Sequence, residues 1–166
     1  MAISTPNYIG VSPAGIEPFS TFGTTQLHPL GMRVKGRDAG STAWGEGEFI
    51  YLVGVADTVA GDVVNIDEGF TTSRGVTRGV GQVAVAMSAC VASNYGWYQI
   101  YGKAKVSAGA AVADTAALFL CATAGSVDDA AVAGDVIYGA RSASATDTGF
   151  IEAILSYPST ADSDVA

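Results

Sequence analysis

Short apolar runs alternate with turn residues along most of the chain. Between Gly31 and Tyr157 there is no proline, and runs rich in Val, Ile, Tyr and Phe are separated by Gly, Asp and Ser. Turn signals that recur about every ten residues are typical of a small β-barrel or sandwich. The pattern predicts an all-β domain with strands at residues 32–38, 48–56, 62–67, 71–77, 81–91, 95–106, 116–122, 135–142 and 150–157.

Residues 110–133 are rich in alanine, and a helix over this stretch is the main alternative to the all-strand interpretation. Its glycine, its aspartates and its lack of Lys, Glu and Gln disfavour a long helix, although a short helix there stays open. Near its end, residues 132–137 (VAGDVI) repeat residues 59–64 (VAGDVV). The glycine suits a tight turn and the Val/Ile pair begins a strand, so we expect a reused turn–strand unit.

The first thirty residues have a different character. They contain four of the five prolines, which fix φ and remove a ladder donor, so an extended N-terminal arm is predicted over residues 1–31. A disordered terminus is the alternative. The arm is too apolar for a solvated tail, so we expect it to dock outside its own domain. The expected anchors are Tyr8, Ile9, Phe19 and Phe22.

The β domain is expected to span residues 32–158, followed by a flexible acidic tail at 159–166. Within the domain, the strand at 95–106 has the densest aromatic cluster, and alternation puts Tyr98 and Ile100 on a core face. The opposite face grades from aromatic residues to lysines, which suits the centre and rim of a protein interface. Core packing and a stacking platform for glycans or single strands are the alternatives. The expected interface residues here are Tyr95, Trp97 and Tyr101.

The composition favours a chain whose surface is partly covered by partners. Of 166 residues, 49% are hydrophobic and 14% are charged, against roughly 25% charged in ordinary soluble domains. Residues 1–105 hold seven basic and eight acidic residues, whereas residues 106–166 hold only Arg141 against eight acidic residues. A general nucleic-acid binder is therefore not expected.

The chain offers little for catalysis. Its single histidine, His28, lies in the arm, and neither a nucleotide-binding glycine motif nor metal-ligand spacing occurs. The paired acidic residues are interpreted as solvated turn residues, and a calcium site formed by loop carboxylates is the alternative. We expect no enzyme activity, no cofactor and no metal. Cys90 and Cys121 lie in apolar surroundings and are predicted to be buried thiols.

Membrane association is not expected either. The charge-poor stretches are broken by polar residues and glycines, and the N-terminus has no basic start followed by an apolar run. We therefore expect neither a membrane span nor a secretory signal, and synthesis in a cytoplasm.

Four segments in about the last two-fifths of the chain share a family likeness: YGKAKV at 101–106 with the Ala-Gly turn after it, CATAGSVD at 121–128, VIYGAR at 136–141 and GFI at 149–151. In these segments the chain resembles the head decoration (cement) proteins of tailed bacteriophages. In such families a small β domain, commonly trimeric, sits at threefold or quasi-threefold positions of the capsid. It ties neighbouring coat subunits together, often through an extended N-terminal arm.

The resemblance implies a structural virion protein that binds the major capsid protein and forms a homo-oligomer, with a trimer favoured. It also implies a place on the capsid surface after synthesis in the host bacterial cytoplasm. A glycan-binding β-sandwich module and another virion component, such as a head fibre or minor tail protein, are the alternatives.

Overall fold

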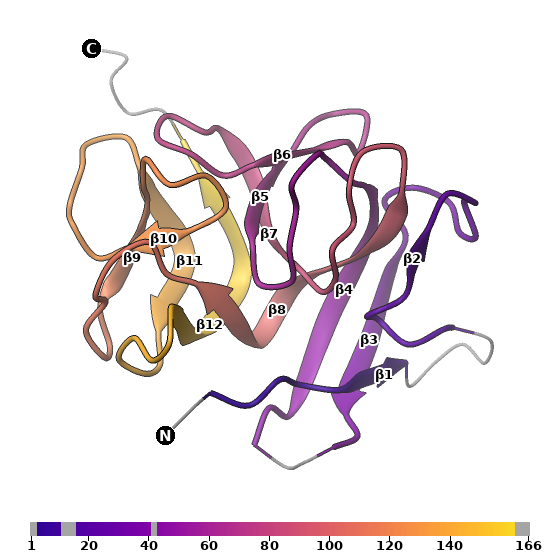
Figure 1. Ribbon diagram of the computed structural model, residues 1–166, viewed down its shortest axis with the longest axis horizontal. Helices are drawn as coiled ribbons and strands as arrows, with labels where there is room; N and C mark the ends of the chain where they lie inside the picture. The colour runs from indigo at the N-terminus through magenta and orange to yellow at the C-terminus, as the bar shows by residue number, and fades with distance from the viewer. Residues whose placement is uncertain (1–2, 11–15, 41–42, 162–166) are drawn as a thin grey trace.

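The computed structural model describes residues 3–10, 16–40 and 43–161, which form β-strands and no helix (Figure 1). The all-β prediction is confirmed, and the alanine-rich stretch forms strands and turns. The strands are β1 (Tyr8–Gly10), β2 (Phe22–Gly23), β3 (Arg33–Asp38), β4 (Glu46–Val53), β5 (Val63–Ile66), β6 (Thr72–Arg74), β7 (Gly81–Ala86), β8 (Tyr95–Ser107), β9 (Ala117–Leu120), β10 (Val127–Asp128), β11 (Val136–Ser142) and β12 (Phe150–Thr160).

The strands form one antiparallel network in the order β1-β3-β4-β8-β7-β12-β11-β9-β10. Strand β2 pairs with β8, and β5 joins β7 to β6. The network does not close into a barrel, so the sandwich is the better of the two predicted forms. Figure 1 shows β8 passing between a half that contains β3 and β4 and a half that contains β9 to β12.

Strand β8 belongs to both halves because it changes partner along its length. Its first part pairs with β4, and from Tyr101 onward it pairs with β12. Gly102 lies at the change with φ of +93°, and a Cβ there would stand 2.4 Å from the Glu46 carbonyl oxygen. Only glycine fits this close approach. The single residue therefore lets one strand serve two sheet regions.

Where β4 and β8 pair, both faces of the sheet are buried. On one face, side chains from these strands pack under β5 and β7. On the other face, Phe49, Tyr51 and Trp97 form the floor of a separate aromatic cluster. Alternation along each strand assigns neighbouring residues to opposite faces, so two covers are needed. The first cluster contains Ile50, Leu52, Val64, Ile66, Ala84, Ala86, Cys90, Tyr98 and Ile100.

The N-terminal segment supplies the second cover. The Phe19 ring stacks on the Phe49 ring with centroids 4.0 Å apart and meets the Trp97 ring edge-on at 5.3 Å. Strand β1 also pairs with β3, and β2 pairs with β8. The expectation of an arm over 1–31 that docks outside its own domain is therefore corrected. Tyr8 and Phe19 of this segment complete the core of their own domain.

The C-terminal boundary also differs from the prediction. Strand β12 continues to Thr160, and Ser159 pairs with Gln82 of β7. The Thr160 hydroxyl is buried and accepts a hydrogen bond from Asn65 Nδ2 at 2.9 Å. The tail predicted from residue 159 therefore begins too early, and its residues 162–166 lie outside the described ranges.

The two repeated segments have the same local structure, as predicted. Each begins with a turn in which the aspartate N–H donates to a valine carbonyl, Asp62 to Val59 and Asp135 to Val132. Each turn then leads into a strand, β5 or β11. Both aspartates are only 1% exposed, and their carboxylates accept hydrogen bonds from another segment, Asp62 from Arg74 Nε and Asp135 from the Arg78 N–H. The repeat is thus a turn whose aspartate anchors a neighbouring loop.

Candidate protein interface

A bulge in β12 turns one tyrosine outward. Tyr138 pairs with Ser159 and Ala140 with Leu155, so residues 156–158 stand opposite Gly139 alone. Gly139 has φ of +75°, and a Cβ there would lie 2.6 Å from the Ser156 carbonyl oxygen. Bulges of this kind re-aim side chains and often lie beside functional sites.

Tyr157, in the bulge, has φ of +50°, a conformation that is unfavourable for a bulky residue. The surrounding structure must hold such strain in place, and strain of this kind concentrates at functional positions. The side chain of Tyr157 is 47% exposed. The strained backbone therefore presents an aromatic ring to the outside.

Contacts from two other strands fix this ring. The Tyr101 ring of β8 lies 5.3 Å from it, centroid to centroid, with the planes tilted by 36°. The Tyr157 hydroxyl donates a 2.7 Å hydrogen bond to the Glu48 carboxylate of β4. That hydrogen bond raises the pKa of Tyr157 above its ordinary value. Because Glu48 is the strand partner of Tyr101, β4, β8 and β12 all meet here.

A third exposed tyrosine extends the patch to β11. Tyr138 is 53% exposed, and its strand partner Ser159 is exposed as well. On the other side of the patch, β3 and β4 set opposite charges across from each other, Lys35 opposite Glu48 and Arg37 opposite Glu46. We call this surface the tyrosine face. It comprises Arg33, Lys35, Arg37, Glu46, Glu48, Tyr101, Tyr138 and Tyr157.

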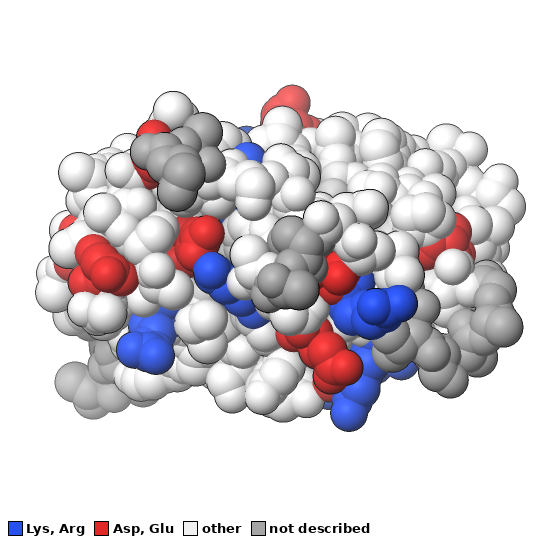
Figure 2. All heavy atoms as spheres, turned by 90° about the horizontal axis from the view of Figure 1, so that it is seen from below, with Lys and Arg blue, Asp and Glu red and all other residues white. Residues whose placement is uncertain are grey.

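The charges near this surface are mixed in sign. Figure 2 shows basic and acidic side chains interleaved along one side of the molecule, with large areas that carry no charge. A surface of this kind does not form the single-sign field that phosphate backbones attract. Aromatic residues beside mixed charges are instead typical of protein contacts.

A second exposed surface, made of apolar side chains, lies around the end of β4. Phe22, Leu27 and Tyr95 line a shallow hollow of about 280 Å³. Phe70 packs its ring against Gly31, and Val91 lies beside Gly54. Of these apolar residues, Leu27 is 58% exposed and Phe22 is 44% exposed. We call the surface formed by Phe22, Leu27, Phe70, Val91 and Tyr95 the apolar end; Phe22 belongs to β2, which is labelled in Figure 1.

The interface prediction is wrong for three of its seven residues. Tyr8 is 2% exposed, and Phe19 and Trp97 are fully buried. The Trp97 indole N–H donates to Glu17 at 2.8 Å, which closes the aromatic cluster from the N-terminal segment. These side chains serve the core because the second face of the β4–β8 pair needs a cover. Trp97 packs in the core, which was one of the alternatives to the interface prediction.

The other four residues remain accessible in part. Ile9 is half-buried in β1, and Phe22 and Tyr95 share the apolar end. Tyr101 lies elsewhere, on the tyrosine face. Contact of these residues with a partner stays a prediction. The sequence reading missed Tyr138 and Tyr157, and the only signals were the neighbouring Gly139 and Pro158.

The histidine and the two cysteines, which the sequence offered as candidates for chemistry, pack against neighbouring side chains or lie buried. His28 Nε2 lies 2.7 Å from Glu17, and its ring meets Tyr51 edge-on. Cys90 and Cys121 are buried free thiols, as predicted. Over residues 3–10, 16–40 and 43–161, no three His, Cys, Asp or Glu side chains gather as metal ligands would. The same ranges contain no helix with the length and apolarity needed to cross a bilayer.

Comparison of the chain with protein-family models, with curated proteins and with solved structures finds no match.

Proposed function

We propose that this chain is a structural virion protein that decorates and stabilises a bacteriophage capsid by binding across neighbouring coat subunits. The observation that carries the proposal is the tyrosine face, where a strained bulge holds Tyr157 against Tyr101 on an exposed surface. The sequence resemblance at residues 101–151, which includes Tyr101 and Tyr138, supports the same role. The partner is the major capsid protein, and the site is the capsid surface.

The tyrosine face has the properties that contact with a coat surface requires. Tyrosine rings bury large apolar areas while their hydroxyls still find hydrogen-bond partners. The Tyr157 ring is already fixed by Tyr101 and Glu48, so docking would cost it little conformational entropy. The flanking charges of both signs would fix the position of the chain relative to complementary charges on the partner.

The apolar end suits contact between copies of the chain. Interfaces between identical subunits are more apolar than transient ones, and this end exposes Phe22, Leu27 and Phe70, although Glu17 also lines its hollow. Closed cyclic symmetry would bury the same patch on every copy. The proposal therefore includes a homo-oligomer, with a trimer favoured, that binds the coat through its tyrosine faces.

Replacing Tyr157 by glycine tests the coat contact without weakening the fold. Tyr157→Gly removes the ring at a backbone conformation that glycine prefers. Thr148→Gly is the matched control, because Thr148 also has positive φ, +51°, and precedes the other end of β12. In co-sedimentation with undecorated capsids, Tyr157→Gly should lower affinity about tenfold or more, as loss of a hot spot does.

Thr148→Gly should bind capsids as the unchanged chain does. Equal binding of both variants would remove the tyrosine face from the proposal. Binding of the free chain to isolated glycans, abolished by Tyr157→Gly, would instead favour the glycan-binding alternative.

A further inference from the structure

Tyr101 and Tyr157 form a pair of exposed aromatic rings in direct contact. The ring centroids lie 5.3 Å apart with the planes tilted by 36°, and the side chains are 45% and 47% exposed. Packed aromatic rings in proteins have centroids about 4.5–7 Å apart, so this pair is at the close end of the range. The two phenol rings are therefore near enough to react with each other, and both are open to a reagent in solution.

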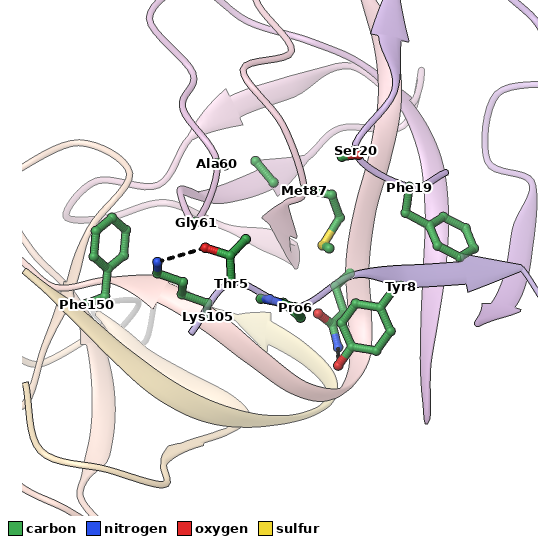
Figure 3. Close-up of a pocket in the computed structure, with 12 residues that line it drawn as sticks. Thr5, Pro6, Tyr8, Phe19, Ser20, Ala60, Gly61, Met87, Lys105 and Phe150 are labelled. Atoms are coloured by element: carbon green, nitrogen blue, oxygen red, sulfur yellow. Dashed lines mark hydrogen bonds between the residues drawn. The ribbon is translucent and has the colours of Figure 1, made fainter. Parts of the chain in front are cut away.

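The other tyrosines of the chain do not combine contact with exposure. Tyr8 is buried beside the pocket between the N-terminal segment and the rest of the domain, where its hydroxyl donates to a backbone carbonyl (Figure 3). Tyr51 and Tyr95 are stacked 6.5 Å apart, but Tyr51 is only 2% exposed. Tyr98 is fully buried, and Tyr138 is exposed but contacts no other tyrosine ring in the described part of the chain. Exposure and ring contact therefore coincide in one tyrosine pair.

The bulge in β12 brings this pair together. Tyr101 is the strand partner of Ser156, so the side chains of these two residues lie on the same face of the sheet. In a regular strand the next residue, Tyr157, would point to the opposite face. Its backbone instead has φ of +50°, and its ring lies against the Tyr101 ring. The local backbone geometry therefore builds the contact.

Glu48 supplies a proton acceptor for one of the two phenols. The Tyr157 hydroxyl donates to its carboxylate at 2.7 Å, which is within the reach required of a general base. This hydrogen bond is the largest cause of the raised pKa of Tyr157, whereas the charge of Arg33 acts in the opposite sense. The phenol therefore keeps its proton until an electron is removed. A phenol that has lost an electron is strongly acidic, so its proton then passes to Glu48.

We propose that Tyr101 and Tyr157 are an oxidative modification site, at which a one-electron oxidant joins the two rings as an intramolecular dityrosine. Each phenol gives one electron to the oxidant and loses one proton, from Tyr157 to Glu48 and from Tyr101 to water. The two phenoxyl radicals then form one carbon–carbon bond between ring positions next to the hydroxyls. The hydrogens on those two carbons move to the oxygens as protons, so the chain loses two hydrogen atoms in all. The inference concerns the free chain and does not depend on the proposed function.

The new bond would tie β8 to β12 across the bulge. As with a disulfide, a covalent link between residues that are far apart in the sequence restricts the unfolded chain more than the folded one. The oxidised chain should therefore unfold at a higher urea concentration than the unoxidised chain.

The test treats the full chain, at low concentration, with photogenerated tris(bipyridine)ruthenium(III), and persulfate is the final electron acceptor. We expect a single-chain product that is lighter by two hydrogen atoms, has dityrosine fluorescence and yields joined peptides containing residues 101 and 157. Tyr101→Phe and Tyr157→Phe each keep a ring but cannot form a phenoxyl radical, so either should abolish this link. Tyr138→Phe, at another exposed tyrosine, is the control and should leave the yield unchanged.

Glu48→Gln tests the proton acceptor. Its amide oxygen can still accept the Tyr157 hydrogen bond but is far less basic, so coupling at pH 7 should be about tenfold slower or more. At alkaline pH, above the pKa of both tyrosines, the variant and the unchanged chain should couple equally fast, and circular dichroism checks that both stay folded. A difference that persists there would contradict the role of Glu48. Coupling only between chains, no dityrosine in the unchanged chain, or an equal yield from Tyr157→Phe would overturn the proposal.

Discussion

At the scale of single residues, Glu17 best explains why the N-terminal segment belongs to the domain. Its carboxylate accepts hydrogen bonds from the Trp97 indole and from His28. Burial acts to raise the pKa of Glu17, but hydrogen bonds from His28, the backbone and Trp97 outweigh it, so the pKa is lowered. A lowered carboxyl pKa contributes stability above the unfolded-state value, and this stability is lost as the pH falls through the folded-state value.

Glu17→Gln should therefore reduce the free energy of unfolding by about 1–2 kcal/mol at pH 7, since it weakens hydrogen bonds to a charged group. The difference from the unchanged chain should shrink as the pH falls from the unfolded-state pKa of Glu17 through its lowered folded-state pKa, below which Glu17 is protonated in both states. Urea unfolding at several pH values measures this difference. Glu68→Gln, at an exposed turn position, is the control. A difference that does not change with pH would contradict the role assigned to the Glu17 charge.

Trp97 shows what residue-level reasoning from the sequence can and cannot predict. Alternation correctly separated it from Tyr98 and Ile100, which lie in the other apolar cluster. The pattern gave the face of the strand but not what covers that face. The cover comes from Phe19 and Tyr8, about eighty or ninety residues earlier in the chain, and no local pattern encodes such a distant contact.

At the scale of elements, the nine predicted strands all appear, because their apolar alternation is strong and their turns are marked by Gly and Asp. Strands β1, β2 and β10 were missed because they have only two or three residues. Strand β12 was ended too early, at 157, because proline usually interrupts a ladder. Pro158 instead lies in the bulge, where a missing N–H costs no ladder bond.

The N-terminal segment offers a matched test of its role as a core element. Phe19 is fully buried and Phe22 is 44% exposed, in the same segment. Phe19→Ala should lower the free energy of unfolding by about 3–5 kcal/mol through lost burial and a cavity. Phe22→Ala should cost less than about 1 kcal/mol. Chemical denaturation of both variants gives the comparison, and equal losses would mean that the segment does not cover the sheet as described.

At the scale of the whole molecule, the low charge fraction acquires a structural meaning. Much of the apolar content is buried in three clusters, but the tyrosine face and the apolar end remain exposed. The low charge fraction predicted that partners cover part of the surface. It could not show that the exposed apolar residues form two distinct surfaces, the tyrosine face and the apolar end. Their residues come from distant strands, such as Tyr101 and Tyr157, and meet only in the fold.

The apolar end should govern self-association. We expect the chain to be an oligomer at micromolar concentration and the double variant Phe22→Ser, Leu27→Ser to dissociate, since two exposed anchors of the patch are lost. Tyr157→Gly should remain oligomeric, because the tyrosine face is assigned to the coat. Sedimentation equilibrium distinguishes these states. A monomeric unchanged chain, or a double variant that stays oligomeric, would contradict the assignment of the apolar end.

Electron cryomicroscopy of capsids incubated with this chain tests the central claim most directly. The account predicts additional density on the outer capsid surface at threefold or quasi-threefold positions, with an oligomer of the β domain whose tyrosine face contacts more than one coat subunit. Tyr157→Gly should leave those positions partly empty under the same conditions. Bare capsids after incubation with the unchanged, folded chain, or density in which the tyrosine face points away from the coat, would contradict it.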